Sequence, residues 1–205
     1  MAASAGQLPM KLWYNSPAQY FEESLPIGNG KLGALVYGNP DQDILYLNDI
    51  TFWTGKPVNL NEGGDAYKYI PLIRQELFKE NYKEADILQH LVQGHNSENY
   101  QPLSTLKIND YAKGSVSNYY RELDIDSAIT KVRYTRGDVT FNREYLASNP
   151  DKLIAIHLTA SKKASINCEI LLTGQTPHKI KAAGKQITML GNAIGDPKES
   201  IHFCS

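Results

Sequence analysis

Residues 25–38 read LPIGNGKLGALVYG, and residues 48–55 read NDITFWTG. In the first stretch, four glycines and a proline frame the short apolar run 32–37, a pattern typical of a buried strand that is entered through a turn. The turn falls on Gly28, Asn29 and Gly30, where a left-handed backbone favours glycine. These residues therefore predict a β-hairpin or a strand entry.

The same glycines also match the spacing of a dinucleotide-binding loop, Gly28-x-Gly30-x-x-Gly33. Such a loop needs a preceding strand and a following helix whose N-terminus holds the pyrophosphate. Here residues 20–24 are polar, and the run after the glycines is β-like and ends in turn residues 38–41. The sequence offers no helix N-terminus to a phosphate and argues against a dinucleotide site.

Composition excludes several classes of protein. The chain has 205 residues, enough for one domain with a sizeable core. Its 21 basic and 22 acidic residues are scattered and leave a net charge of −1, which argues against binding of nucleic acid or an anionic membrane. No apolar run reaches the roughly 18 residues of a membrane span. The first residues lack signal-peptide features, and we expect residues 1–11 to be an unstructured or added lead.

A period of two in hydrophobicity dominates the chain after residue 101. Strands are expected at 12–14, 32–37, 43–48, 103–108, 119–124, 129–135, 139–145, 153–159, 165–172, 179–183, 186–190 and 201–204. Many short strands at roughly ten-residue spacing predict an antiparallel sandwich. The last of them has no turn or polar tail after it, so we expect the domain, residues 12–205, to be truncated at its C-terminal end.

A short helical pair is expected near residues 70–94, between the strands. Pro71 suits the first turn of one helix, which extends to about Lys79. Asn81 and Glu84 have the spacing of a capping box for the second helix, and Gly94 is expected to end it. The predicted fold class is therefore mainly β with a helical insertion.

Catalytic and metal-binding patterns are missing from the sequence. The five histidines show no metal-ligand spacing, so we expect no metal site and no cofactor. The near-neighbour acids, which include Asp41 and Asp43, lie beside turn or polar residues and are expected on solvated faces rather than in an apolar glycosidase pocket. No G-x-S-x-G elbow occurs. Cys168 and Cys204 either form one disulfide or remain two free thiols, and the sequence leaves both open.

Polar and aromatic residues gather at the ends of the expected strands. The candidate site residues are Asn29, Asn48, Asp49, Trp53, Tyr100 and Gln101. Amides, an acid and flat rings suit a sugar site and equally suit a seam between domains. The sequence favours the seam. A stand-alone carbohydrate-binding module that uses Trp53 and Tyr100 as stacking platforms is the alternative.

Five blocks along the chain resemble one known family. They are residues 25–34, 47–55, 100–103 (YQPL), 120–124 (YRELD) and 143–151 (REYLASNPD). In this order they are similar to the N-terminal domain of glycoside hydrolase family 95, the 1,2-α-L-fucosidases. Ile50, Phe52 and Thr54 depart mildly from the family pattern.

The resemblance implies an antiparallel β-super-sandwich of galactose-mutarotase-like topology, joined through a helical linker to an (α/α)6 barrel that is absent from this chain. It implies inverting hydrolysis of terminal α-L-fucosyl linkages, with the catalytic residues in that barrel and none here. The expected partners are therefore the chain's own C-terminal barrel and, for the full-length protein, a fucosylated oligosaccharide. A related sugar such as L-galactose is an alternative substrate. The family also implies a periplasmic or extracellular location.

Overall fold

The computed structural model describes residues 10–55, 64–94, 98–194 and the backbone of 202–204. Its strands are β1 (Lys11–Tyr14), β2 (Leu25–Gly28), β3 (Leu32–Val36), β4 (Gln42–Asp49), β5 (Ser104–Asp110), β6 (Val116–Asp124), β7 (Ile129–Arg136), β8 (Val139–Ser148), β9 (Leu153–Ala160), β10 (Cys168–Thr173), β11 (His178–Ala183), β12 (Gln186–Asn192) and β13 (His202–Cys204). The helices are α1 (Ile70–Phe78) and α2 (Tyr82–Gln89), with short 3-10 turns at Phe21–Glu23 and Ala66–Tyr69. Most of the expected lead, residues 1–9, lies outside the described residues.

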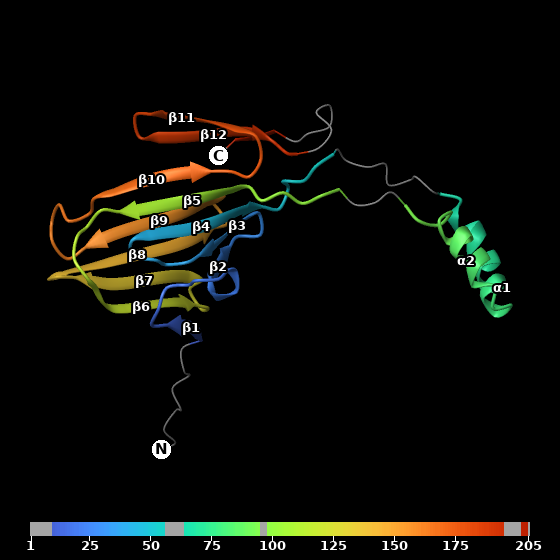
Figure 1. Cartoon of the computed structure of the whole chain (residues 1–205), viewed down its shortest axis with the longest axis horizontal. Helices are drawn as coiled ribbons and strands as arrows, with labels where there is room; N and C mark the ends of the chain where they lie inside the picture. Colours follow the sequence, from blue (N-terminus) through green and yellow to red (C-terminus); the bar gives the residue numbers. More distant parts are fainter. Residues whose placement is uncertain (1–9, 56–63, 95–97, 195–201, 205) are drawn as a thin grey trace, which may run out of the picture. The chain divides into compact units, whose positions relative to one another are not determined.

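The strands form two five-stranded sheets and one smaller sheet (Figure 1). The first sheet has the order β1-β6-β7-β8-β9, the second β10-β5-β4-β3-β2, and the third β11-β12-β13. All of these pairings are antiparallel. The chain divides into two compact units, one of residues 1–54 with 100–205 and one of residues 55–99 that holds the helices. The prediction of a mainly β, antiparallel sandwich with a helical pair is confirmed.

The glycine-framed stretch forms the hairpin of β2 and β3. Gly30 has φ +86° and lies between Asn29, whose N–H donates to the Leu32 carbonyl, and Lys31. A positive φ at the first central position is typical of a type II′ turn, which matches the twist of the flanking strands. The hairpin is one of the two alternatives that the sequence left open, and its first strand, β2, contains Pro26. The sheet tolerates this proline because β2 is an edge strand.

The main core lies between the two large sheets. Its buried residues are Ile27, Ala34, Val36, Leu45 and Ile108 from one sheet and Val132, Tyr134, Phe141 and Tyr145 from the other. Side chains alternate between the faces of a strand, so each sheet turns its remaining side chains outward. A smaller cluster of Phe52, Leu172, Met189 and Ala193 joins the third sheet to the end of the second.

A buried charged network crosses the core. The Arg143 guanidinium lies 3.6 Å from an Asp43 carboxylate oxygen and 3.2 Å from one of Asp110. It also donates to the carbonyls of Asn39 and Pro40 at 2.9 Å. Asp43 is fully buried, so the expectation that it lies on a solvated face is wrong. Sequence neighbours could not reveal this, because its cationic partner is 100 positions away.

Two tyrosines complete the network around these charges. The Tyr145 hydroxyl donates to Asp43, and the Tyr134 hydroxyl donates to Asp110 at 2.7 Å. Burial raises the pKa of Tyr145 and of Tyr134 well above the usual phenol value, so both hydroxyls stay protonated and remain donors. The backbone N–H of Gly38 donates a further bond to Asp43 at 2.7 Å.

The helical unit differs in detail from the sequence expectation. Asn81 precedes α2, but its side chain makes no cap; its amide donates instead to Glu76 Oε2 at 2.8 Å. The expected capping box is therefore not formed. Helix α2 also ends at Gln89, five residues before Gly94. Ala85 is the one buried residue within the two helices, which leaves their apolar side chains largely exposed.

The cysteines can be placed only in part. Cys168 is a free thiol on β10, partly buried against the main core. The backbone of Cys204 pairs with Leu190 in the third sheet, and its side chain lies outside what the structure describes.

The buried network predicts a large difference between two arginines of the same sheet. We expect Arg143→Met to lower the free energy of unfolding by about 3–5 kcal/mol, because it leaves Asp43 and Asp110 buried without their counter-charge. Arg133→Met changes an exposed arginine on the opposite face and should stay within about 0.5 kcal/mol. Urea unfolding at neutral pH measures both, and equal losses would contradict this account.

Candidate functional site

Three of the candidate residues form a cluster where β4 ends. Trp53 and Tyr100 face each other in an isolated antiparallel bridge, and their rings meet edge to face at a centroid distance of 5.9 Å. The Tyr100 hydroxyl donates to Asn48 Oδ1 at 2.5 Å. Partial burial raises the pKa of Tyr100, so this donor keeps its proton at neutral pH. The Trp53 indole N–H donates to the Ile50 carbonyl at 2.9 Å, which fixes the ring.

Two further candidates hold the same segment in place. The backbone N–H of Gln101 donates to the Phe52 carbonyl at 3.0 Å and extends the pairing of the two segments. Asp49 Oδ1 accepts from the Thr51 N–H at 2.9 Å and from the Thr51 hydroxyl at 2.7 Å. Asp49 therefore shapes the turn after β4. Its other oxygen lies 4.0 Å from Lys31 Nζ.

Asn29 lies in the β2–β3 turn and is committed to the backbone. Its Oδ1 accepts from the N–H groups of Lys31 and Leu32 at 3.0 and 2.8 Å, and its Nδ2 donates to the Ser148 carbonyl at 2.7 Å. Asn149 in turn donates to the Asn29 carbonyl at 2.8 Å. Asn29 thus ties one sheet to the other, and the described hydrogen bonds do not join it to the Asn48–Tyr100 pair.

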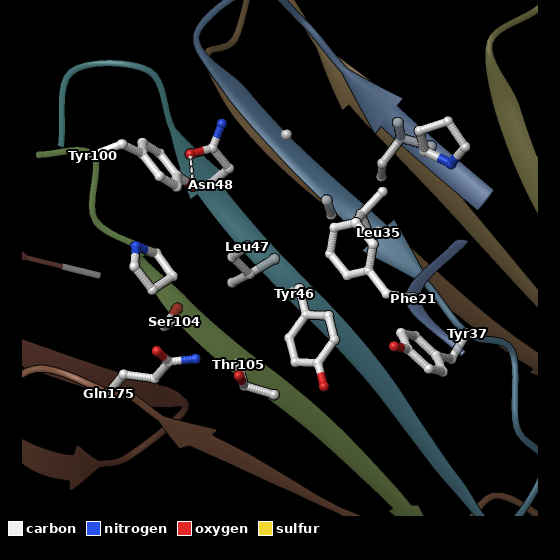
Figure 2. Close-up of a pocket in the computed structure, with 15 residues that line it drawn as sticks. Phe21, Leu35, Tyr37, Tyr46, Leu47, Asn48, Tyr100, Ser104, Thr105 and Gln175 are labelled. Carbon is white, nitrogen blue, oxygen red and sulfur yellow. Dashed lines mark hydrogen bonds between the residues drawn. The ribbon is translucent and has the colours of Figure 1, made fainter. Parts of the chain in front are cut away.

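A cavity of about 570 Å³ opens beside this cluster on the outer face of the β10-β5-β4-β3-β2 sheet. Leu35, Tyr46 and Thr105 are directly paired across three strands and form its floor. Figure 2 shows the rings of Phe21, Tyr37 and Tyr46 at one end and the bonded Asn48–Tyr100 pair toward the other.

The aromatic residues of the cavity contact one another. Tyr46 lies edge to face with Tyr37, at a centroid distance of 5.4 Å, and stacks on Phe21 at 6.2 Å. The sequence reasoning missed these three rings. The available signal was Tyr46, which alternates with the inward-facing Leu45 and Leu47 and therefore had to lie on the outer face.

One buried hydroxyl in the cavity wall is unsatisfied. Ser104 is 4% exposed, and its Oγ has no hydrogen-bond partner among the described residues. Gln175 also lines the cavity, and Figure 2 shows it next to Ser104. A buried polar group without a partner costs free energy. A group of another molecule or another part of the protein that enters the cavity could satisfy it.

This cavity is lined mostly by apolar and aromatic residues, with the polar residues Asn48, Ser104, Thr105 and Gln175 among them. Most glycoside hydrolases place two carboxyl groups across the scissile bond, and none of the described residues that line the cavity is an aspartate or glutamate. Among the described residues, no three His, Cys, Asp or Glu side chains are grouped as metal ligands would be. Of the helices that the structure describes, none is long and apolar enough to cross a bilayer.

The contacts of Asn29 predict a structural cost on substitution. Asn29→Ala removes three hydrogen bonds to partly buried backbone groups, and we expect the free energy of unfolding to fall by about 2–3 kcal/mol. Asn142→Ala, an exposed asparagine of β8, should stay within about 0.5 kcal/mol. Chemical unfolding measures the stability of both variants. If Asn29→Ala were as stable as the control, the hydrogen bonds of Asn29 between the sheets would not contribute to stability.

Known proteins resemble the chain over nearly its whole length. Residues 12–205 match the family model described as Glycosyl hydrolase family 65, N-terminal domain. Alpha-L-fucosidase 2 of Arabidopsis thaliana is 33% identical over 189 residues, which cover 90% of this chain and 22% of that protein. Probable alpha-fucosidase A of Aspergillus niger is 28% identical over 196 residues, which cover 88% of this chain and 24% of that protein.

The chain therefore matches a domain model, and the relatives that it matches are much longer than the chain. The chain spans about a quarter or less of the length of the curated relatives it matches. The resemblance to the N-terminal domain of a fucosidase family is confirmed by the model match and by the names of these relatives. The chain belongs to the family of glycosyl hydrolase N-terminal domains described as Glycosyl hydrolase family 65, N-terminal domain.

Proposed function

We propose that this chain is the non-catalytic N-terminal domain of a family 95 glycoside hydrolase, and that the full-length protein removes terminal α-L-fucosyl residues from oligosaccharides with inversion. The names of the relatives support fucose as the sugar that is removed, and the greater length of the relatives leaves room for a catalytic barrel. The acid-free cavity supports a domain that does no hydrolysis itself. By family resemblance the protein acts in the periplasm or outside the cell.

The observation that carries this proposal is the aromatic cavity on the outer sheet face. Phe21 is 57% exposed, Tyr100 46% and Trp53 38%, although all three are large apolar side chains. Contiguous exposed apolar surface marks a contact site, and aromatic residues carry much of the binding energy at interfaces. We assign this face to packing against the (α/α)6 barrel, where the unpaired Ser104 hydroxyl would find a partner.

The helical unit, taken by itself, supports the same role. Phe78 is 88% exposed and Tyr82 66%, and both lie at the adjoining ends of the two helices. A helix pair that buries so little of its own apolar surface gains stability by packing on further protein. The proposal therefore gives each unit of the chain an apolar surface for the rest of the enzyme.

The proposed activity is tested by comparing two proteins. The 205-residue chain and the full-length protein are incubated with 2′-fucosyllactose, and released fucose is measured. We expect release by the full-length protein alone. Release by the 205-residue chain would contradict a non-catalytic domain, and no release by either would contradict the assigned substrate.

The packing role is tested by Trp53→Ala in the full-length protein. Trp53 fixes the Tyr100 end of the cavity, so its removal should weaken the interdomain contact by about 2 kcal/mol and lower the rate of fucose release. Denaturant unfolding and kcat/KM are the measurements. Tyr111→Ala, which removes an exposed ring away from the cavity, is the control and should leave both unchanged. If Trp53→Ala left both the unfolding and the kinetics unaltered, this face would not be the interdomain contact.

A further inference from the structure

A second hollow lies on the other large sheet, on the face turned away from the core. Figure 1 shows this sheet, β1-β6-β7-β8-β9. This groove has a volume of about 390 Å³. Eight of the side chains that line it come two from each of β6, β7, β8 and β9. We call this surface the β6–β9 groove.

The strand register arranges these side chains in two rows. In the first row Trp13, Glu122, Lys131, Glu144 and His157 lie directly opposite one another on five successive strands. In the second row the same pairing joins Tyr120, Arg133, Asn142 and Thr159. Directly paired residues share a face of the sheet, so both rows point out of the sandwich. The three strand spacings from β6 to β9 make the groove about 14 Å long.

An aromatic platform stands at the β1 end of the groove. Trp13 stacks on Tyr120 with a centroid distance of 6.2 Å and an interplanar angle of 24°, and it is 58% exposed. Lys11 Nζ donates to the Tyr120 hydroxyl at 2.9 Å and to Glu122 Oε2 at 3.0 Å. The Tyr120 hydroxyl donates to the same Glu122 oxygen at 2.7 Å. These bonds hold the ring beneath Trp13 and leave the tryptophan open to solvent.

The charges of the groove alternate and nearly cancel. Glu122 pairs with Lys11, and Glu144 lies 3.3 Å from His157 Nδ1. The hydrogen bond from Tyr120, followed by that from Lys11, lowers the pKa of Glu122. Glu122 is therefore an ionised acceptor at neutral pH and not the protonated acid that glycoside hydrolysis needs. The groove is equipped to bind rather than to cleave.

We propose that the β6–β9 groove binds a neutral oligosaccharide, with one pyranose ring stacked on Trp13 and its hydroxyls bonded along the row of Glu122, Lys131 and Glu144. A pyranose has an apolar face of C–H groups and an edge of neighbouring hydroxyls that both donate and accept. The exposed indole matches the face, and the alternation of carboxylates and amines matches the edge.

Other occupants fit these features less well. A nucleic acid would need an excess of basic groups, and here the acids are interleaved with them. An apolar protein surface would find one exposed ring beside two rows that are otherwise mostly polar or charged. This proposal does not rest on the proposed function, because the groove and the aromatic cavity lie on different sheets.

The first test uses the two tryptophans, Trp13 and Trp53, as separate reporters. Trp53→Phe leaves Trp13 as the sole indole, and Trp13→Phe leaves Trp53. Each variant of the 205-residue chain is titrated with lactose and with 2′-fucosyllactose while indole emission is recorded. We expect a saturable change from Trp13 alone. No saturable change up to about 10 mM sugar, or a change confined to Trp53, would overturn the proposal.

The second test measures affinity by calorimetry. Trp13→Ala and Glu122→Gln should each weaken binding of the same sugars at least tenfold, because one removes the platform and the other weakens the central acceptor. Leu146→Ala, on the same outer face in the neighbouring row, should change the dissociation constant less than twofold. Far-UV circular dichroism checks that the variants fold. Equal affinity in folded Trp13→Ala would overturn the proposal. A second pair of results would also overturn it: no sugar binding by the 205-residue chain, and a lowered unfolding midpoint for Trp13→Ala in the full-length protein. The groove would then be a contact with another part of the protein.

Discussion

The rest of this structure depends on the ion pairs and hydrogen bonds that the Arg143 guanidinium makes. The guanidinium reaches from β8 across the core to Asp43 on β4 and Asp110 at the end of β5, and so joins the two large sheets. Buried charges are tolerated only when they are paired and hydrogen-bonded. A one-residue slip of either strand would turn its charged group to the opposite face. The network therefore fixes the register of one sheet against the other.

That register decides which side chains remain outside. With Leu45 inward on β4, Tyr46 must face outward and form the floor of the aromatic cavity. With Arg143 inward on β8, the neighbouring Glu144 must face outward and join the β6–β9 groove. The same alternation that builds the core thus positions both outer surfaces, and the inter-sheet ties of Arg143 and Asn29 hold them on a rigid scaffold.

Sequence periodicity predicted the strands well where local pattern decides the outcome. It left open whether residues 25–28 form a strand of a hairpin, since a strand that contains Pro26 is tolerated only at a sheet edge, and edge position depends on the whole topology. It placed Asp43 in solvent, because its partner lies far along the chain. Spacing also suggested a cap at Asn81, whose amide goes instead to Glu76 across the helix junction. Trp53, Tyr100 and Asn48 were singled out by type, but only the fold shows that they meet.

The two outer faces of the sandwich differ in chemistry, and the difference follows from which residues alternate with the core. The cavity on the β10-β5-β4-β3-β2 sheet is lined by Leu35 and by the rings of Phe21, Tyr37 and Tyr46, which gain free energy when they are covered. The β6–β9 groove is lined mostly by charged and polar side chains beside the stacked rings of Trp13 and Tyr120, and a protein surface could cover these charges only at a desolvation cost. A polyhydroxy ligand can replace the water on such a face bond for bond. We therefore propose protein contact for the aromatic cavity and a sugar ligand for the β6–β9 groove.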